Sequence, residues 1–99
     1  MSEREEKIWS EKRYIIETVL SKGSLYYGKE SFSLKNNSDP WIMFYRIEEC
    51  GYRTKRAMLR KAEQMENGQY EIKRLCVTLT YHLNESGCTR PYKMEREYI

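Results

Sequence analysis

The sequence is poor in the residues on which enzymes most often depend. It contains one histidine, His82, and one aspartate, Asp39, among its 99 residues. A triad of serine, histidine and aspartate could use only that pair, and Asp39 stands directly before Pro40, an arrangement typical of a helix start. The five glycines are isolated, so phosphate-binding loops, dinucleotide-binding fingerprints and nucleophile elbows are missing. We therefore expect no enzyme activity and no cofactor.

Long apolar runs are missing as well. The longest, Trp41 to Tyr45, is far shorter than the ~18 to 20 residues that a membrane-spanning helix needs. The N-terminal segment carries Glu3, Glu5 and Glu6 where a secretory signal would place basic and then apolar residues. These absences predict a protein without a membrane span that stays inside the cell.

Cysteine is scarce: the chain has only Cys50, Cys76 and Cys88. Their number is odd, and no two of them form a C-x-x-C pair. This pattern favours reduced thiols, with one bridge between Cys76 and Cys88 as the alternative. The even spacing of Cys76, His82 and Cys88 suggests zinc ligands. In a strand, however, Cys76 and His82 would lie about 20 Å apart, whereas zinc ligands lie within about 2.3 Å of one ion. We expect no metal site.

The composition is that of one folded domain. Charged residues make up 33% and hydrophobic residues 39% of the chain, which argues against intrinsic disorder. A length of 99 residues provides for one core, so we expect a single domain over residues 1–99. Nine tyrosines and two tryptophans supply large ring surfaces for a core or an interface.

The N-terminal fifth of the chain has a helical pattern. Ser2 and Glu5 have the spacing of a capping box, and apolar residues recur at intervals that a helix would gather on one side. These apolar residues are Ile8, Ile15, Ile16, Val19 and Leu20. The pattern predicts a helix over residues 3–22 that ends at Gly23.

The middle of the chain predicts a hairpin and two more helices. Residues 24–27 and the alternating residues 31–35 favour two short strands. A helix is predicted over residues 40–50, apolar around most of its circumference and therefore buried. Thr54 can cap another helix, over residues 55–67, with one apolar and one basic side.

The C-terminal third predicts strands. Apolar and polar residues alternate over residues 69–83, a turn follows at residues 84–87, and alternation returns after Pro91, which suggests an edge strand. Together, the patterns predict a single α+β domain with about three helices packed on a small antiparallel sheet.

One stretch of the sequence is rich in cations. The basic residues are Arg53, Lys55, Arg56, Arg60 and Lys61. They follow an alternating strand around Phe32 and lie at the start of the second of two helices. This order of strand, helix and helix over residues 31–66 resembles the ribbon-helix-helix family of DNA-binding proteins. The resemblance implies that Ser31, Ser33 and Lys35 face bases, while the cations contact phosphates.

The whole pattern also resembles the small uncharacterised proteins of archaeal filamentous viruses of the lipothrixvirus and rudivirus type. The features concerned are the Glu-rich residues 4–9, the apolar residues 41–47 and the strand at residues 70–75. The resemblance implies an archaeal viral protein, thermostable, in the host cytoplasm, with an unusual fold and no assigned activity.

Two functions follow as hypotheses. The first is a non-enzymatic interaction protein that forms a homodimer and contacts a viral or host protein, with Trp41, Phe44 and Tyr45 as interface candidates. The alternative is a nucleic-acid-binding protein that uses the basic helix over residues 53–61.

Overall fold

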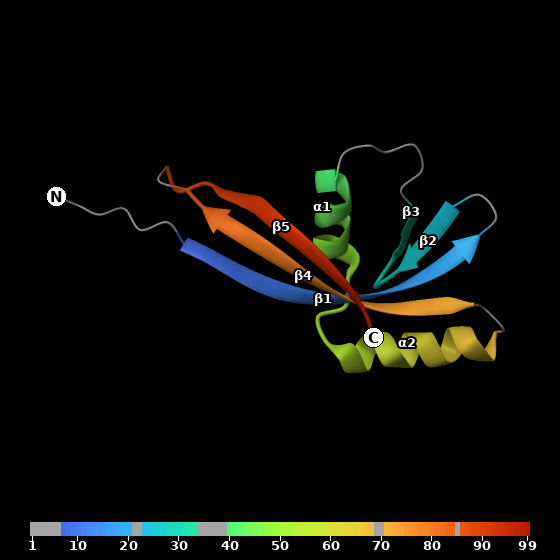
Figure 1. The fold of residues 1–99 in the computed structure, drawn as a ribbon. Coiled ribbons are helices and arrows are strands. Elements are labelled where there is room, and N and C mark those ends of the chain that lie inside the picture. Colours follow the sequence, from blue (N-terminus) through green and yellow to red (C-terminus); the bar gives the residue numbers. More distant parts are fainter. Residues whose placement is uncertain (1–6, 21–22, 34–39, 69–70, 85) are drawn as a thin grey trace.

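The computed structural model describes residues 7–20, 23–33, 40–68, 71–84 and 86–99. Five antiparallel strands form one sheet in the order β3-β2-β1-β4-β5, and two helices lie against it (Figure 1). The elements are β1 (Lys7–Leu20), β2 (Gly23–Tyr27), β3 (Ser31–Ser33), α1 (Pro40–Cys50), α2 (Lys55–Asn67), β4 (Ile72–Leu83) and β5 (Thr89–Tyr98). The predicted α+β class with an antiparallel sheet is therefore confirmed.

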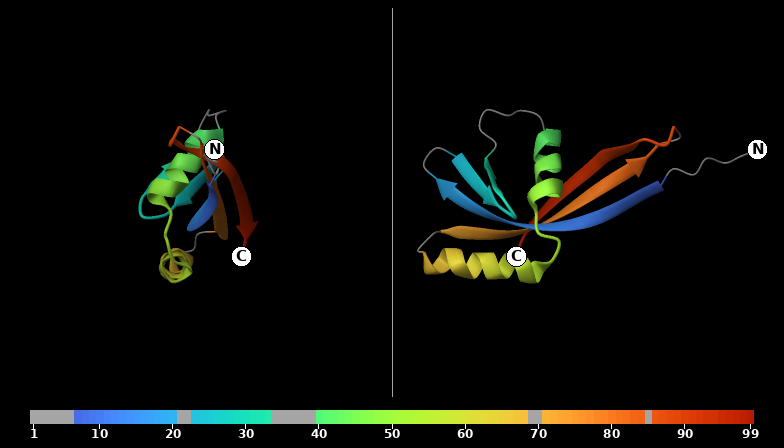
Figure 2. Two further views of the ribbon diagram at one scale, coloured as in Figure 1. Left: turned by 90° about the vertical axis from the view of Figure 1, so that its left-hand side faces the viewer. Right: turned by 180° about the vertical axis from the view of Figure 1, so that it is seen from behind.

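The two helices cover opposite faces of the sheet (Figure 2). Ile15 belongs to the core beneath α1, whereas its neighbour Ile16 belongs to the core beneath α2, and both are fully buried. Successive side chains of a strand point to opposite faces, so one strand can contribute residues to two cores. The core under α1 is the larger and takes residues from every strand except β5, whose Met94 packs against it.

The predicted helix over residues 3–22 is wrong for its described part, because residues 7–20 form β1. β1 pairs with β4 in an unbroken register from Lys7 opposite Leu83 to Thr18 opposite Ile72. A strand that is buried on both faces carries neighbouring apolar residues, as a helix does, so the spacing did not distinguish the two. The structure accordingly has two helices among its described residues.

The remaining elements follow the predictions closely. The Thr54 hydroxyl accepts a hydrogen bond of 3.2 Å from the Ala57 N–H, which confirms the predicted cap of α2. β2 and β3 form the predicted hairpin, and β5 lies at the sheet edge, as Pro91 suggested. The predicted cap at Asp39 lies outside the described residues.

Toward the N-terminal end of β1, the sheet extends to one side of the helices as an arm (Figure 1). We define the arm as residues 7–13 of β1, 77–83 of β4 and 89–95 of β5; its base lies in the core beneath α1, where Leu79 and Tyr81 are buried. β2 pairs with β1 only over residues 16–20. No described residue pairs with the outer edge of β1 over residues 7–13, so the arm has an open edge there.

Candidate protein-interaction surface

Three exposed aromatic rings gather on the α1 side of the sheet. Trp9, Trp41 and Tyr45 have exposed fractions of 38%, 40% and 51%. We call these three residues the aromatic patch. Isolated apolar residues at a surface are ordinary, whereas a group of large rings marks a contact site.

Two buried rings support the aromatic patch. Trp9 stacks on Tyr81 with ring centroids 5.4 Å apart, and Tyr81 meets Phe44 edge to face at 5.3 Å. Phe44 in turn contacts Trp41 and Tyr45, each with centroids 6.0 Å apart. Because Phe44 and Tyr81 are buried, the exposed rings rest on a fixed base and lose little conformational entropy on binding.

The three predicted interface residues differ in their exposure to solvent. Trp41 and Tyr45 are exposed, but Phe44 has no exposed surface and packs in the core of its own chain. Phe44 is therefore unavailable to a partner, contrary to the prediction. Trp9 was not predicted as an interface residue, because a helix over residues 3–22 gave no reason to place it beside α1.

A polar groove of about 590 Å³ lies next to Tyr45. Its lining residues are Glu11, Arg13, Lys29, Tyr45, Glu48, Glu49 and Arg53. Arg13 is nearly buried, and its guanidinium donates to the Glu48 carbonyl at 3.3 Å and the Lys12 carbonyl at 3.1 Å. The groove contains three acidic and three basic side chains, a mixture that suits a polypeptide better than a phosphate.

A hydrogen bond joins the polar groove to Tyr81, one of the two buried rings beneath the aromatic patch. The Tyr81 hydroxyl donates to the Glu48 carboxylate and so ties β4 to α1. Burial, and then this hydrogen bond, raise the pKa of Tyr81 well above its usual value of about 10. The phenol therefore stays protonated at neutral pH and remains a donor.

This pKa shift predicts a loss of stability in alkali. A tyrosine whose pKa is higher in the folded than in the unfolded chain adds stability below about pH 10, and this contribution is lost as the pH rises further. Urea unfolding at about pH 8 and about pH 11 should show a smaller alkaline loss for Tyr81→Phe than for the unaltered chain. Equal losses in the two proteins would contradict the assignment. At about pH 8 the substitution should cost roughly 1 kcal/mol through the lost hydrogen bond.

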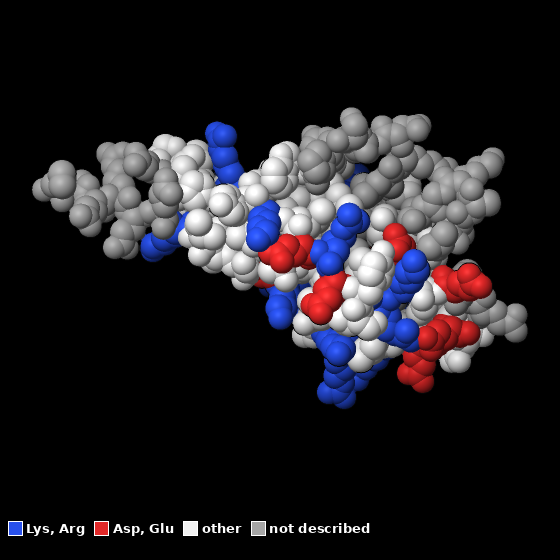
Figure 3. Space-filling view, viewed as in Figure 1, with Lys and Arg blue, Asp and Glu red and all other residues white. Residues whose placement is uncertain are grey.

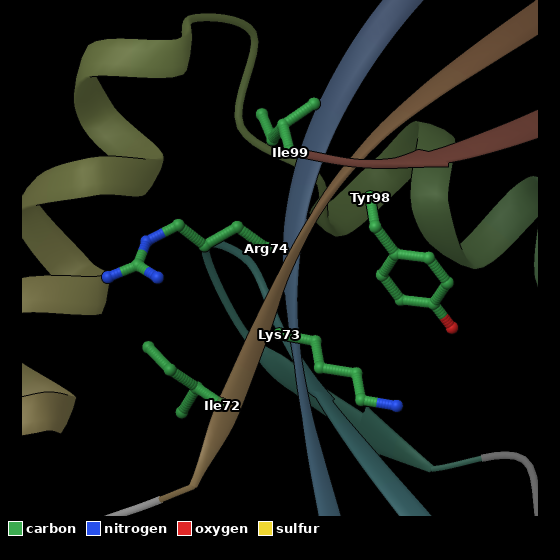
Figure 4. A pocket seen from close by; sticks show the side chains of 5 residues that line it. All are labelled: Ile72, Lys73, Arg74, Tyr98 and Ile99. Atoms are coloured by element: carbon green, nitrogen blue, oxygen red, sulfur yellow. The ribbon is translucent and has the colours of Figure 1, made fainter.

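A second hollow, of about 450 Å³, lies where β5 stops alongside β4 (Figure 4). Lys73 of β4 and Tyr98 of β5 lie on one side of β4, while Ile72 and Arg74 lie on the other (Figure 4). The Lys73 Nζ lies 5.4 Å from the centre of the Tyr98 ring, and Arg74 pairs with Glu66. These side chains do not converge on a common centre, so the hollow offers no obvious ligand site.

Most of the predicted nucleic-acid residues that the structure describes fall on the α2 side of the sheet, whereas Arg53 lines the polar groove beside Tyr45. Arg53, Lys55, Arg56 and Arg60 are exposed, and none has an ion-pair partner among the described residues. Figure 3 shows basic side chains over and beside α2, with acidic ones toward its C-terminal end. Lys61 is partly buried, with its Nζ 5.8 Å from the centre of the Tyr27 ring.

The strand of the ribbon-helix-helix resemblance is paired within the chain. β3 pairs with β2, and α1 and α2 lie on opposite faces of the sheet. Because Phe32 is buried beneath α1, its exposed neighbours Ser31 and Ser33 face the other way, toward the α2 side. Lys35 lies outside the described residues.

The cysteines and the histidine do not form a site in the described part of the chain. All three thiols are free, which contradicts the alternative of a bridge between Cys76 and Cys88. Cys76 and His82 both lie in β4, as predicted, so the strand keeps them apart. Over the described residues, no three histidine, cysteine, aspartate or glutamate side chains lie close enough to hold a metal ion.

Comparisons with protein-family models, with curated proteins and with solved structures find no match for this chain. The resemblances to ribbon-helix-helix proteins and to archaeal viral proteins therefore stay predictions. No helix in the described ranges is long and apolar enough to cross a membrane.

Proposed function

We propose that this chain is a non-enzymatic protein-interaction module that forms a homodimer through the aromatic patch and the open edge of the arm. The observation that carries the proposal is the aromatic patch, in which three exposed rings rest on the buried Phe44 and Tyr81. Tryptophan and tyrosine are the residues in which interfaces most often concentrate their binding energy.

Two neighbouring features support the same surface. The open edge of β1 leaves backbone donors and acceptors available to another strand. The polar groove shares Tyr45 with the aromatic patch and provides charges of both signs at its border. An apolar centre with a polar rim is the usual anatomy of a protein interface.

Truncation of the exposed rings tests this proposal. Tyr45→Ala and Trp41→Ala should each weaken self-association about tenfold or more, because such residues contribute 1–2 kcal/mol or more at an interface centre. Sedimentation equilibrium over a concentration series measures the effect. Leu59→Ala is the matched control, since Leu59 is 41% exposed but lies on α2, on the other side of the sheet. A strictly monomeric unaltered chain at high concentration would refute the proposal.

Nucleic-acid binding is a second candidate, favoured by one observation. Arg53, Lys55, Arg56 and Arg60 are exposed without ion-pair partners in the described part of the chain, and two of them lie in the first turn of α2. Cations at a helix N-terminus oppose the helix dipole, at a cost of about 0.3–1 kcal/mol each. An anionic partner would remove that cost.

Salt dependence distinguishes this second function. If the cations contact phosphates, the affinity for duplex DNA should fall steeply with salt, and Arg56→Ala with Arg60→Ala should reduce the slope of log K against log salt by about two. Glu63→Ala, an exposed change on the same helix, serves as the control. No binding of DNA even at low salt would eliminate this candidate.

A further inference from the structure

The direction of the backbone groups along the open edge of β1 can be determined. The Tyr14 N–H donates to the Tyr52 carbonyl at 2.8 Å, and the Tyr52 N–H donates to the Tyr14 carbonyl at 2.9 Å. The backbone N–H and C=O groups of Tyr14 therefore point away from β4. In an antiparallel sheet this direction alternates along a strand, and the register with β4 is unbroken over residues 7–18. The N–H and C=O groups of Ser10 and Ile8 consequently point outward as well.

The side chains along this edge have charges that would be complementary between two copies of the same strand. Lys7, Trp9 and Glu11 are exposed and share the α1 side of the sheet, because alternate residues of a strand lie on one face. Consider two β1 strands paired antiparallel about a two-fold axis at Trp9. Lys7 of each chain then lies opposite Glu11 of the other, which gives two such pairs. The same axis also places the two Trp9 rings together at the centre.

We infer that a second copy of this chain adds its β1 antiparallel to the open edge, with Trp9 opposite the partner's Trp9. This inference rests on the proposed function and specifies its partner and register. Ile8 and Ser10 exchange four backbone hydrogen bonds with the partner's Ser10 and Ile8. Lys7 pairs with the partner's Glu11 in two symmetric ion pairs, each added to the contact of 3.5 Å that Glu11 makes with Arg13 of its own chain. The arms of the two chains join as a six-stranded sheet.

The other edges of the sheet are less suited to pairing. β5 carries Pro91, which has no N–H to donate, and its register with β4 shifts at Thr80 and Tyr81. Proline, irregular register and charge are devices that protect an edge strand from association. The outer edge at β3 is only three residues long. Over residues 7–13, β1 therefore offers an open edge that is longer than β3 and has neither the proline nor the register shift of β5.

The fold also limits the length of the pairing. Tyr52 occupies the position beside Tyr14 that a further strand would take, so the partner's β1 is held to the stretch around residues 7–11. The antiparallel orientation sends the partner's helices beyond the tip of the arm. In each chain the helices lie away from the tip of the arm (Figure 2), so this pairing places the helices of the two chains toward opposite ends of the joined sheet.

Exchange of charges across the interface tests the register. Lys7→Glu and Glu11→Lys should each weaken self-association about tenfold, because each places like charges opposite one another twice. An equimolar mixture of the two variants should restore association as a heterodimer, and both changes in one chain should restore the homodimer. Lys55→Glu makes the same charge change on α2 and should leave association unaltered. Sedimentation equilibrium measures all of these.

A backbone variant tests the edge itself. Ile8→Pro removes an outward N–H, so it should abolish the dimer while circular dichroism shows the fold intact. A dimer that survives Ile8→Pro, or that shows no restoration in the mixture, would overturn the inferred register. If that dimer is still weakened by Tyr45→Ala, a homodimer through the aromatic patch stands, without the pairing of the open edges. A monomeric unaltered chain would overturn the proposed function as well.

Discussion

Replacement of Phe44 by alanine is expected to remove about 3–5 kcal/mol of the free energy of unfolding, which is a large share of the stability of a domain of this size. Phe44 has no exposed surface and contacts Tyr81, Trp41 and Tyr45 in the larger core. Truncation would leave a cavity beneath the aromatic patch. Thermal unfolding followed by circular dichroism should show a midpoint lowered by about 15 °C or more.

Tyr45→Ala provides the matched comparison, because Tyr45 is the next residue of α1 and is half exposed. This substitution should change the free energy of unfolding by less than about 1 kcal/mol, since little core volume is lost. The pair of variants thus separates folding from binding: Phe44→Ala affects stability, and Tyr45→Ala affects self-association. Similar losses of stability in both would contradict the described packing of α1.

Replacement of Gly28 by alanine is expected to have the second large effect. A Cβ atom at this position would lie 2.0 Å from the carbonyl oxygen of Cys50, a backbone atom at the end of α1. The Lys29 N–H donates to the same oxygen at 2.6 Å, so the hairpin turn and the helix end are held together. Separating them should cost about 3 kcal/mol, as in other overpacked sites, measurable by urea unfolding.

Gly87→Asn is the control for this glycine. Gly87 has a φ of 84°, in the left-handed region, but a Cβ atom there would meet nothing within 4 Å. Asparagine tolerates this conformation better than most residues, so the free energy of unfolding should change by less than about 1 kcal/mol. A mild effect of Gly28→Ala, no larger than that of Gly87→Asn, would show that the turn does not pack against α1.

The helices and the hairpins could be predicted because their signals are local. The cap at Thr54 acts through a hydrogen bond to a residue three positions away, and Gly51 follows α1 directly. The alternation in β4 was equally readable, since it extends over a long segment. These features depend on neighbours in the chain and not on distant contacts.

The candidate surface was only partly predictable. Trp41, Phe44 and Tyr45 could be singled out as aromatic residues of one helix. Their different burial could not, because Phe44 is buried whereas Trp41 and Tyr45 are exposed. Trp9 reaches the same surface from a strand that lies far away in sequence, through its stacking on Tyr81. Such a combination of residues depends on the order of strands in the sheet.

By itself, the sequence determined the α+β class, the two helices with their limits and the strands of the C-terminal half. Only the tertiary structure decided that residues 7–20 form a strand and that this strand has an open edge. The physical reason is the position of the helices. Because α1 and α2 cover opposite faces of the sheet, Ile15 and Ile16 are both buried, and a doubly buried strand has the same local apolar pattern as a helix.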